Sequence, residues 1–114
     1  MTPTVAIVEP RREFAVALQE VVALAHCTPL VVDDFQELSQ LPFPPAAVVV
    51  RIAALLQTVP PQDHIAAARP KIFALASTDA DDAEARRLGC DVVLREPQQV
   101  RALYDALLEI AFPQ

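Results

Sequence analysis

We expect the chain to fold as a single three-layer α/β domain, in which five parallel strands form a sheet with helices on both faces. Two observations predict this fold. Five short apolar runs alternate with segments whose apolar residues recur at helical spacing, and such alternation is typical of parallel strands joined by helices. The runs are apolar almost throughout, as expected for strands covered on both sides. A length of 114 residues suits one domain, so we predict one domain over residues 1–114.

The five predicted strands are short and rich in β-branched residues. They cover residues 4–9, 29–32, 46–52, 71–76 and 91–94. The third has the strongest strand pattern, because its sequence AAVVVRI carries a single charge, Arg51, at its C-terminal end. The pattern alone leaves the order of the strands open, and a similar open sheet with a different order remains the alternative.

The predicted helices follow the strands. They cover about residues 10–25, 35–41, 77–88 and 97–111, with a weak helix that ends near residue 68. Asp34 is a plausible N-cap of the second, Thr78 or Asp79 caps the helix at 77–88, and Gly89 is its natural C-cap. The apolar residues expected to face the core are Phe14, Leu18, Val21, Val22 and Ala25 in the first helix and Val100, Leu103, Tyr104, Leu107, Leu108 and Ala111 in the last.

Composition excludes several classes of function. A net charge of −6 argues against direct nucleic-acid binding and against a basic membrane-surface helix. The apolar runs are too short to span a bilayer, and the N-terminus does not have the pattern of a signal peptide, so we expect a cytoplasmic protein. The single glycine, Gly89, excludes a Rossmann fingerprint and a P-loop.

Cysteine and histidine give no sign of a metal or redox site. Cys27 and Cys90 are expected to be two small buried thiols, and His26 and His64 have no ligand-like spacing. We therefore expect no metal and no cofactor.

Landmarks along the chain occur in the order and spacing of a known family. One apolar strand ends in an acidic residue, Glu9, and a later strand ends at Arg51. The sequence ARRLGCDVVLREP, residues 85–97, is followed by an amphipathic helix, and its matching positions are Gly89, Asp91, Leu94 and Pro97. Over essentially its whole length the chain resembles the receiver domain of two-component response regulators. The resemblance implies a flavodoxin-like sheet of order 2-1-3-4-5, with the functional site beyond the C-terminal strand ends. In that order Cys27 and Cys90 lie at opposite edges, about 19 Å apart, too far for a disulfide.

The resemblance also implies where receiver chemistry should lie, and the chain departs from the family pattern there. A receiver has an acidic pair for Mg²⁺, a phosphoacceptor aspartate, a Thr or Ser, an aromatic switch residue and a lysine before the proline. The matching positions are Glu9 and Pro10, Arg51, Ala76 with Ser77 beside it, Val93, and Glu96 before Pro97. The acceptor carboxylate is thus replaced by a cation, and the lysine by a carboxylate.

This exchange of charge predicts the electrostatics of the pocket. Glu9, Glu96 and Arg51 carry a net charge of −1, with a cation at the acceptor position, so we predict no useful Mg²⁺ site. We hypothesise that Arg51 pairs with Glu96, Glu9 or both. The alternative is that Arg51 extends into solvent and contributes little.

Three functions remain open. The favoured one is a pseudo-receiver, a non-enzymatic interaction module of signal transduction that acts independently of phosphorylation. Its partner would be a signalling protein, an effector domain, or a second copy bound through an apolar stripe of the last helix, Ala102, Ala106 and Ile110. The alternatives are a receiver phosphorylated at Asp33 or Asp34, and a small-ligand-binding flavodoxin-like domain or enzyme. The paired carboxylates Asp33-Asp34 and Asp81-Asp82 are better explained as helix caps and first-turn residues.

Overall fold

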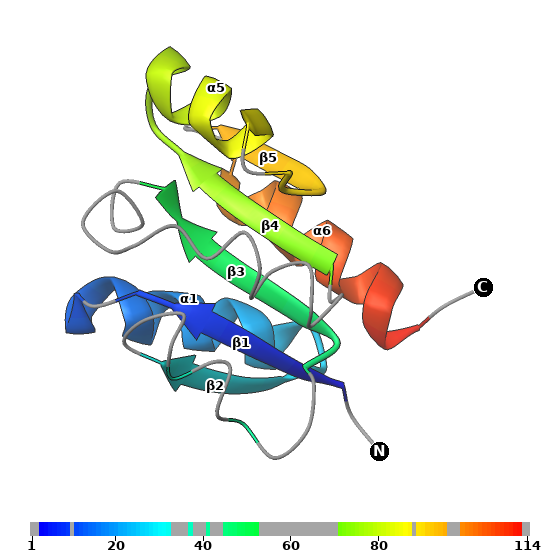
Figure 1. The fold of residues 1–114 in the computed structure, drawn as a ribbon. Helices are drawn as coiled ribbons and strands as arrows, with labels where there is room; N and C mark the ends of the chain where they lie inside the picture. Colours follow the sequence, from blue (N-terminus) through cyan, green and yellow to red (C-terminus); the bar gives the residue numbers. More distant parts are fainter. Residues whose placement is uncertain are drawn as a thin grey trace.

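A parallel sheet of five strands forms the centre of the computed structural model, which describes residues 3–9, 11–32, 37, 41, 45–52, 71–87, 89–95 and 99–112. The strands are β1 (Thr4–Val8), β2 (Thr28–Val32), β3 (Ala47–Arg51), β4 (Lys71–Ala76) and β5 (Val92–Arg95). Their order is β2-β1-β3-β4-β5, and every neighbouring pair is parallel (Figure 1). The predicted α/β fold and the strand order implied by the resemblance are both confirmed.

Three helices are described: α1 (Arg12–Leu24), α5 (Asp79–Arg87) and α6 (Gln99–Ala111). Helices α1 and α6 pack against each other on one face of the sheet, and α5 contacts β4 and β5 from the other (Figure 1). The predicted helices at 35–41 and before residue 68 fall outside the described residues, apart from Glu37 and Leu41. None of the helices in the described part of the chain is long and apolar enough to cross a membrane.

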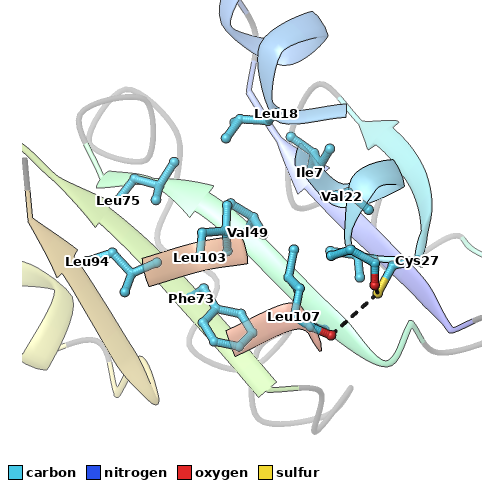
Figure 2. Packing of buried hydrophobic residues seen from close by; sticks show 13 residues of the cluster. Ile7, Leu18, Val22, Cys27, Val49, Phe73, Leu75, Leu94, Leu103 and Leu107 are labelled. Carbon is cyan, nitrogen blue, oxygen red and sulfur yellow. Dashed lines mark hydrogen bonds between the residues drawn. The ribbon is translucent and has the colours of Figure 1, made fainter. Parts of the chain in front are cut away.

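Alternate residues of the strands build two hydrophobic clusters, one on each face of the sheet. On the α5 face, Val8, Val48 and Val50 pack with Ala85 of the helix. On the α1 and α6 face, a larger cluster contains Ile7, Leu18, Val22, Val49, Phe73, Leu103 and Leu107 (Figure 2). The thiol of Cys27, in the same cluster, donates a hydrogen bond to the carbonyl oxygen of Leu107 and links the end of α1 to α6. A sheet covered on both faces explains why its strands are apolar almost throughout.

Parts of the predicted helix faces are wrong. Phe14 and Val100 were expected in the core, but their exposed fractions are 38% and 53%. Both residues lie near the N-terminal end of a helix, and the apolar spacing does not show how far the sheet extends beneath that end. The stripe Ala102, Ala106 and Ile110 is half-buried and packs against the larger cluster, so the inner face of α6 is wider than predicted.

Helix α5 ends at a left-handed glycine, as predicted. Gly89 has a φ of +83°, its N–H bonds the carbonyl of Arg86, and the N–H of Cys90 bonds that of Ala85. This pair of hydrogen bonds is the Schellman motif. A Cβ at Gly89 would meet no atom within 4 Å, so the backbone conformation alone explains the glycine.

Helix α1 ends in the same motif, with a histidine at the position of the glycine. His26 has a φ of +64°, its N–H bonds the carbonyl of Ala23, and the N–H of Cys27 bonds that of Val22. The imidazole of His26 contacts the ring of Phe112 edge to face, with 5.3 Å between the ring centroids. Nothing in the spacing of apolar residues had indicated a left-handed residue here.

Candidate functional site

An ion pair lies at the C-terminal ends of the neighbouring strands β1 and β3. Val8 of β1 pairs with Val50 of β3, so the next residues, Glu9 and Arg51, emerge side by side. Arg51 Nε lies 2.5 Å from Glu9 Oε2, and the side chains of Arg51 and Glu9 are 15% and 0% exposed. The predicted pairing of Arg51 with Glu9 is confirmed, whereas Glu96 lies outside the described residues.

The second carboxylate oxygen of Glu9 is also bonded. Glu9 Oε1 accepts a hydrogen bond of 3.1 Å from the backbone N–H of Arg11, the residue before α1. The buried carboxylate therefore meets a guanidinium through one oxygen and the start of a helix through the other. Glu9 links β1, β3 and α1 at one point.

The ring of Phe14 lies close to two guanidinium groups. The Arg51 guanidinium carbon is 4.8 Å from the ring centroid, and that of Arg11 is 5.5 Å from the same centroid. Both distances are within the range of a cation–π contact. The Arg51 side chain is thus restrained by a carboxylate and an aromatic face together, and it does not extend freely into solvent.

The end of β4 lacks a hydroxyl at the aligned position. Ala76 is fully buried, and its carbonyl accepts a hydrogen bond of 3.4 Å from the Nε2 of buried Gln99, at the start of α6. Ser77, the next residue, is exposed, and its backbone N–H donates to Asp81 Oδ2. Thr78 Oγ1 accepts from the N–H of Asp81, which identifies Thr78 as the N-cap of α5.

A second group of charges lies beyond the end of β5, near the solvent. Arg95 NH1 lies 2.9 Å from Asp79 and 3.4 Å from Asp82, and Asp82 also pairs with Arg86. The hydrogen bond from Arg86, with a further one from Arg95, lowers the pKa of Asp82, and the hydrogen bond to Asp79 raises the pKa of Arg95. Asp79 and Arg86 are exposed and Asp82 and Arg95 are half-buried, whereas Glu9 is fully buried, so water screens this group more than the Glu9–Arg51 pair.

The remaining aligned positions have structural roles or lie outside the described residues. Val93 is half-buried, pairs with Ala74 and packs against the cluster on the α5 face. Asp91 bonds the backbone N–H of Ile72 through Oδ2 at 2.8 Å and so joins β5 to β4. The positions outside the described residues are Pro10, Asp33, Asp34, Glu96 and Pro97.

Both cysteines are free thiols with raised pKa values. Cys27 is buried as predicted, but Cys90 is only half-buried. Burial raises the pKa of Cys27, and burial together with the charge of Asp91 raises the pKa of Cys90 to about 11. Neither thiol is a ready nucleophile at neutral pH.

The donor set that the structure describes does not fit a divalent cation. No group of three His, Cys, Asp or Glu side chains comes together within the described ranges. Glu9, the one carboxylate that the described residues place between β1 and β3, already bonds Arg51 and the N–H of Arg11. A doubly charged ion about 4 Å from Arg51 would be repelled by about 8 kcal/mol at an effective dielectric of about 20.

Sequence reasoning missed three contributors to the site: Arg11, Phe14 and Gln99. Arg11 contributes its backbone N–H, which bonds Glu9, and its guanidinium, which contacts the ring of Phe14. Neither contact leaves a pattern in the sequence. Phe14 was assigned to the core by its spacing alone. Gln99 is a polar residue at the start of an amphipathic helix. Its role is shown only by its low exposure of 7% and by its hydrogen bond to the carbonyl of Ala76.

Comparison with known proteins supports the fold. At the level of sequence, no family model and no curated protein matches the chain. The chain is similar to the crystal structure of a response regulator receiver protein from Burkholderia phymatum, with a TM-score of 0.73 and 18% identity over 99% of this chain and 100% of that one. A response regulator CheY-like protein from Mesorhizobium loti gives a TM-score of 0.73 and 19% identity over 94% and 97% of the two chains.

A third structure comes from a different kind of signalling protein. The signal receiver domain of a modulated diguanylate cyclase from Desulfovibrio desulfuricans is similar with a TM-score of 0.69 and 20% identity over 97% of this chain and 94% of that one. With the strand order and the strand-end site, these similarities lead to one conclusion: the chain has the fold of the response regulator receiver domains.

Proposed function

We propose that the chain is a pseudo-receiver, one receiver-like domain over residues 1–114 that acts as an interaction module in signal transduction without being phosphorylated. The observation that carries this proposal is the buried ion pair between Glu9 and Arg51. It places a guanidinium where the resemblance expects the phosphoacceptor carboxylate, and it occupies the carboxylate expected to bind Mg²⁺.

The ion pair limits the number of stable states that the strand-end site can adopt. A receiver switches because a phosphoryl group adds about −2 charge at one point and draws neighbouring groups toward it. Here Arg51 supplies a permanent positive charge at that point, and Glu9 and Phe14 restrain it. A site whose charges are already paired has little to gain from a phosphoryl group, so we expect a single conformation and no enzymatic activity.

We propose that the partner is a signalling protein or effector domain in the cytoplasm. Self-association through Ala102, Ala106 and Ile110 of α6 is a second proposal, supported by the incomplete burial of this stripe. Strictly monomeric sedimentation at high concentration would contradict the self-association.

Phosphorylation at Asp33 or Asp34 is the main alternative, and intact mass spectrometry separates it from our proposal. The protein is incubated with acetyl phosphate and Mg²⁺ and then weighed. We expect no adduct. A gain of about 80 Da, the mass of one phosphoryl group, that is lost in Asp33→Asn/Asp34→Asn would establish the alternative.

A further inference from the structure

Two polar side chains are buried in the described part of the chain, and both lie at the edge where the strands end. Glu9, 1% exposed, follows β1, and Gln99, 7% exposed, is the first residue of α6. Glu9 bonds the backbone N–H of Arg11 before α1, and Gln99 Nε2 donates to the carbonyl of Ala76, the last residue of β4. Both helices on this face of the sheet are therefore tied at their start to a strand end by a buried polar group.

The stability of the core does not explain an amide at the start of α6. Leu103 and Leu107, which follow Gln99 on the inner face of this helix, are apolar and fully buried. The buried amide loses its hydration, and its hydrogen bond of 3.4 Å is longer than usual, so it regains little. An apolar side chain of similar size would pack there at least as well. Buried polar groups that break a local rule are often kept because they specify one arrangement.

The apolar contacts of α6 do not by themselves define where its first turn lies on the sheet. Burial of apolar surface is non-directional, and two residues of the inner face, Ala102 and Ala106, are small. A hydrogen bond requires one donor to meet one acceptor in a defined direction. The bond from Gln99 to Ala76 thus selects one position of the first turn along β4.

The other end of α6 is held by separate contacts. The thiol of Cys27 donates a hydrogen bond to the carbonyl of Leu107 (Figure 2), and the ring of Phe112 contacts the ring of His26. Both contacts lead to the C-terminal end of α1. Loss of the bond from Gln99 would therefore free the first turn of α6 and leave the C-terminal half in place.

We propose that Gln99 is a positioning residue that holds the start of α6 on the end of β4 and so keeps this helix in one position. The proposal rests on the proposed role as an interaction module with a single conformation. It names the residue that fixes the helix carrying the stripe Ala102, Ala106 and Ile110, and it adds a second buried lock to the Glu9–Arg51 pair.

The test compares the full chain with Gln99→Met by NMR relaxation dispersion of the backbone amides, which detects motion in microseconds to milliseconds. Methionine is similar in size to glutamine but has no donor for the carbonyl of Ala76. We expect the amides of Ala76 and Val100 to show exchange with a minor state populated at about 1% or more in Gln99→Met. The same amides should show none in the unmodified chain, and Ile110, at the other end of α6, should show none in either protein.

Leu103→Met is a matched control one turn further along α6. It makes a volume-conserving change in the same buried layer and keeps the amide of Gln99, so we expect no exchange at Ala76 or Val100. Thermal unfolding gives a second readout. The midpoint of Gln99→Met should be no lower than that of Leu103→Met, so exchange in Gln99→Met would not reflect a loss of overall stability.

Several results would overturn the proposal: no exchange at Ala76 and Val100 in Gln99→Met, the same exchange in both variants, or exchange that reaches Ile110 to the same extent. A midpoint of Gln99→Met well below that of Leu103→Met would also overturn it, because the amide would then be needed for stability. Failure here is distinguishable from failure of the proposed function. A phosphoryl adduct in the mass measurement would refute the pseudo-receiver, whereas the absence of exchange without an adduct would refute only the role of Gln99.

Discussion

Helices α1 and α5 both begin beyond the C-terminal ends of strands, α1 after β1 and α5 after β4, yet their first turns are stabilised in different ways. The N-cap of α5 is Thr78, its first turn contains Asp79, Asp81 and Asp82, and its last turn contains Arg86 and Arg87. Each of these features stabilises a helix locally. Helix α1 has an arginine as N-cap, a single acidic residue in its first turn and no basic residue in its last.

At the start of α1, a tertiary contact replaces the local signals that α5 has. The N-cap residue of α1, Arg11, has no side chain that bonds the first N–H groups of the helix. The backbone N–H of Arg11 itself donates to Glu9, and Glu9 also bonds Arg51 of β3. The cap and first-turn charges of α5 come from its own sequence, whereas the start of α1 is bonded by Glu9, a member of the strand-end ion pair. The candidate site and the stability of α1 are therefore coupled.

The largest expected effect comes from removing the cation of this pair. Arg51→Met leaves the carboxylate of Glu9 buried without its partner, and we expect the free energy of unfolding to fall by about 3–5 kcal/mol. Urea unfolding followed by circular dichroism measures it. The control is Glu9→Gln/Arg51→Met, which removes both charges and should recover part of the loss. A loss below about 1 kcal/mol would mean that the pair behaves as an exposed one.

A smaller effect is expected at the C-terminal end of α5. Gly89→Ala places a Cβ on a left-handed residue without creating a clash, so we expect a loss of about 1–2 kcal/mol from the backbone conformation alone. The same unfolding measurement applies. An unchanged stability would show that this residue does not hold its positive φ in solution.

The smallest effect is expected at the matching end of α1, and its sign is opposite. His26→Gly relieves a left-handed residue but removes the contact with Phe112, so we expect a net gain below about 1 kcal/mol. The two helices end in the same hydrogen-bonded motif. His26→Gly introduces a glycine at the left-handed position and Gly89→Ala removes one, so the two variants test the same backbone effect in opposite directions. A loss on His26→Gly would mean that the histidine and its contact with Phe112 outweigh the backbone strain.

The amount that the sequence predicted differs between the strands and the helices. Strands of a parallel sheet are covered on both faces, so their apolar runs and the charge at Arg51 were visible directly. The pairing of Arg51 with Glu96, Glu9 or both was a hypothesis that depended on the resemblance, and the structure confirms it for Glu9. Helix faces depend on where the sheet stops, which spacing does not report. Phe14 was therefore placed in the core, although it lies at the surface and contacts two arginines.

The second charged group was missed for a different reason. The resemblance drew attention to Glu96 and Pro97, and Arg95, one residue earlier, received no role although it pairs with Asp79 and Asp82. Those carboxylates were recognised only as first-turn residues of a helix. Their partner comes from a strand that follows the helix in sequence, and only the packing of α5 against β5 brings the two together.

In our proposal the Glu9–Arg51 pair fills the strand-end site and leaves no place for Mg²⁺ or a phosphoryl group. The most direct test follows the backbone amide resonances of Arg11, Arg51 and Ser77 by NMR while Mg²⁺ and beryllium fluoride, a phosphoryl analogue, are added together. Our account predicts that these resonances stay in place up to millimolar concentrations. Saturable shifts of all three would show that the site binds both ligands and would contradict the account.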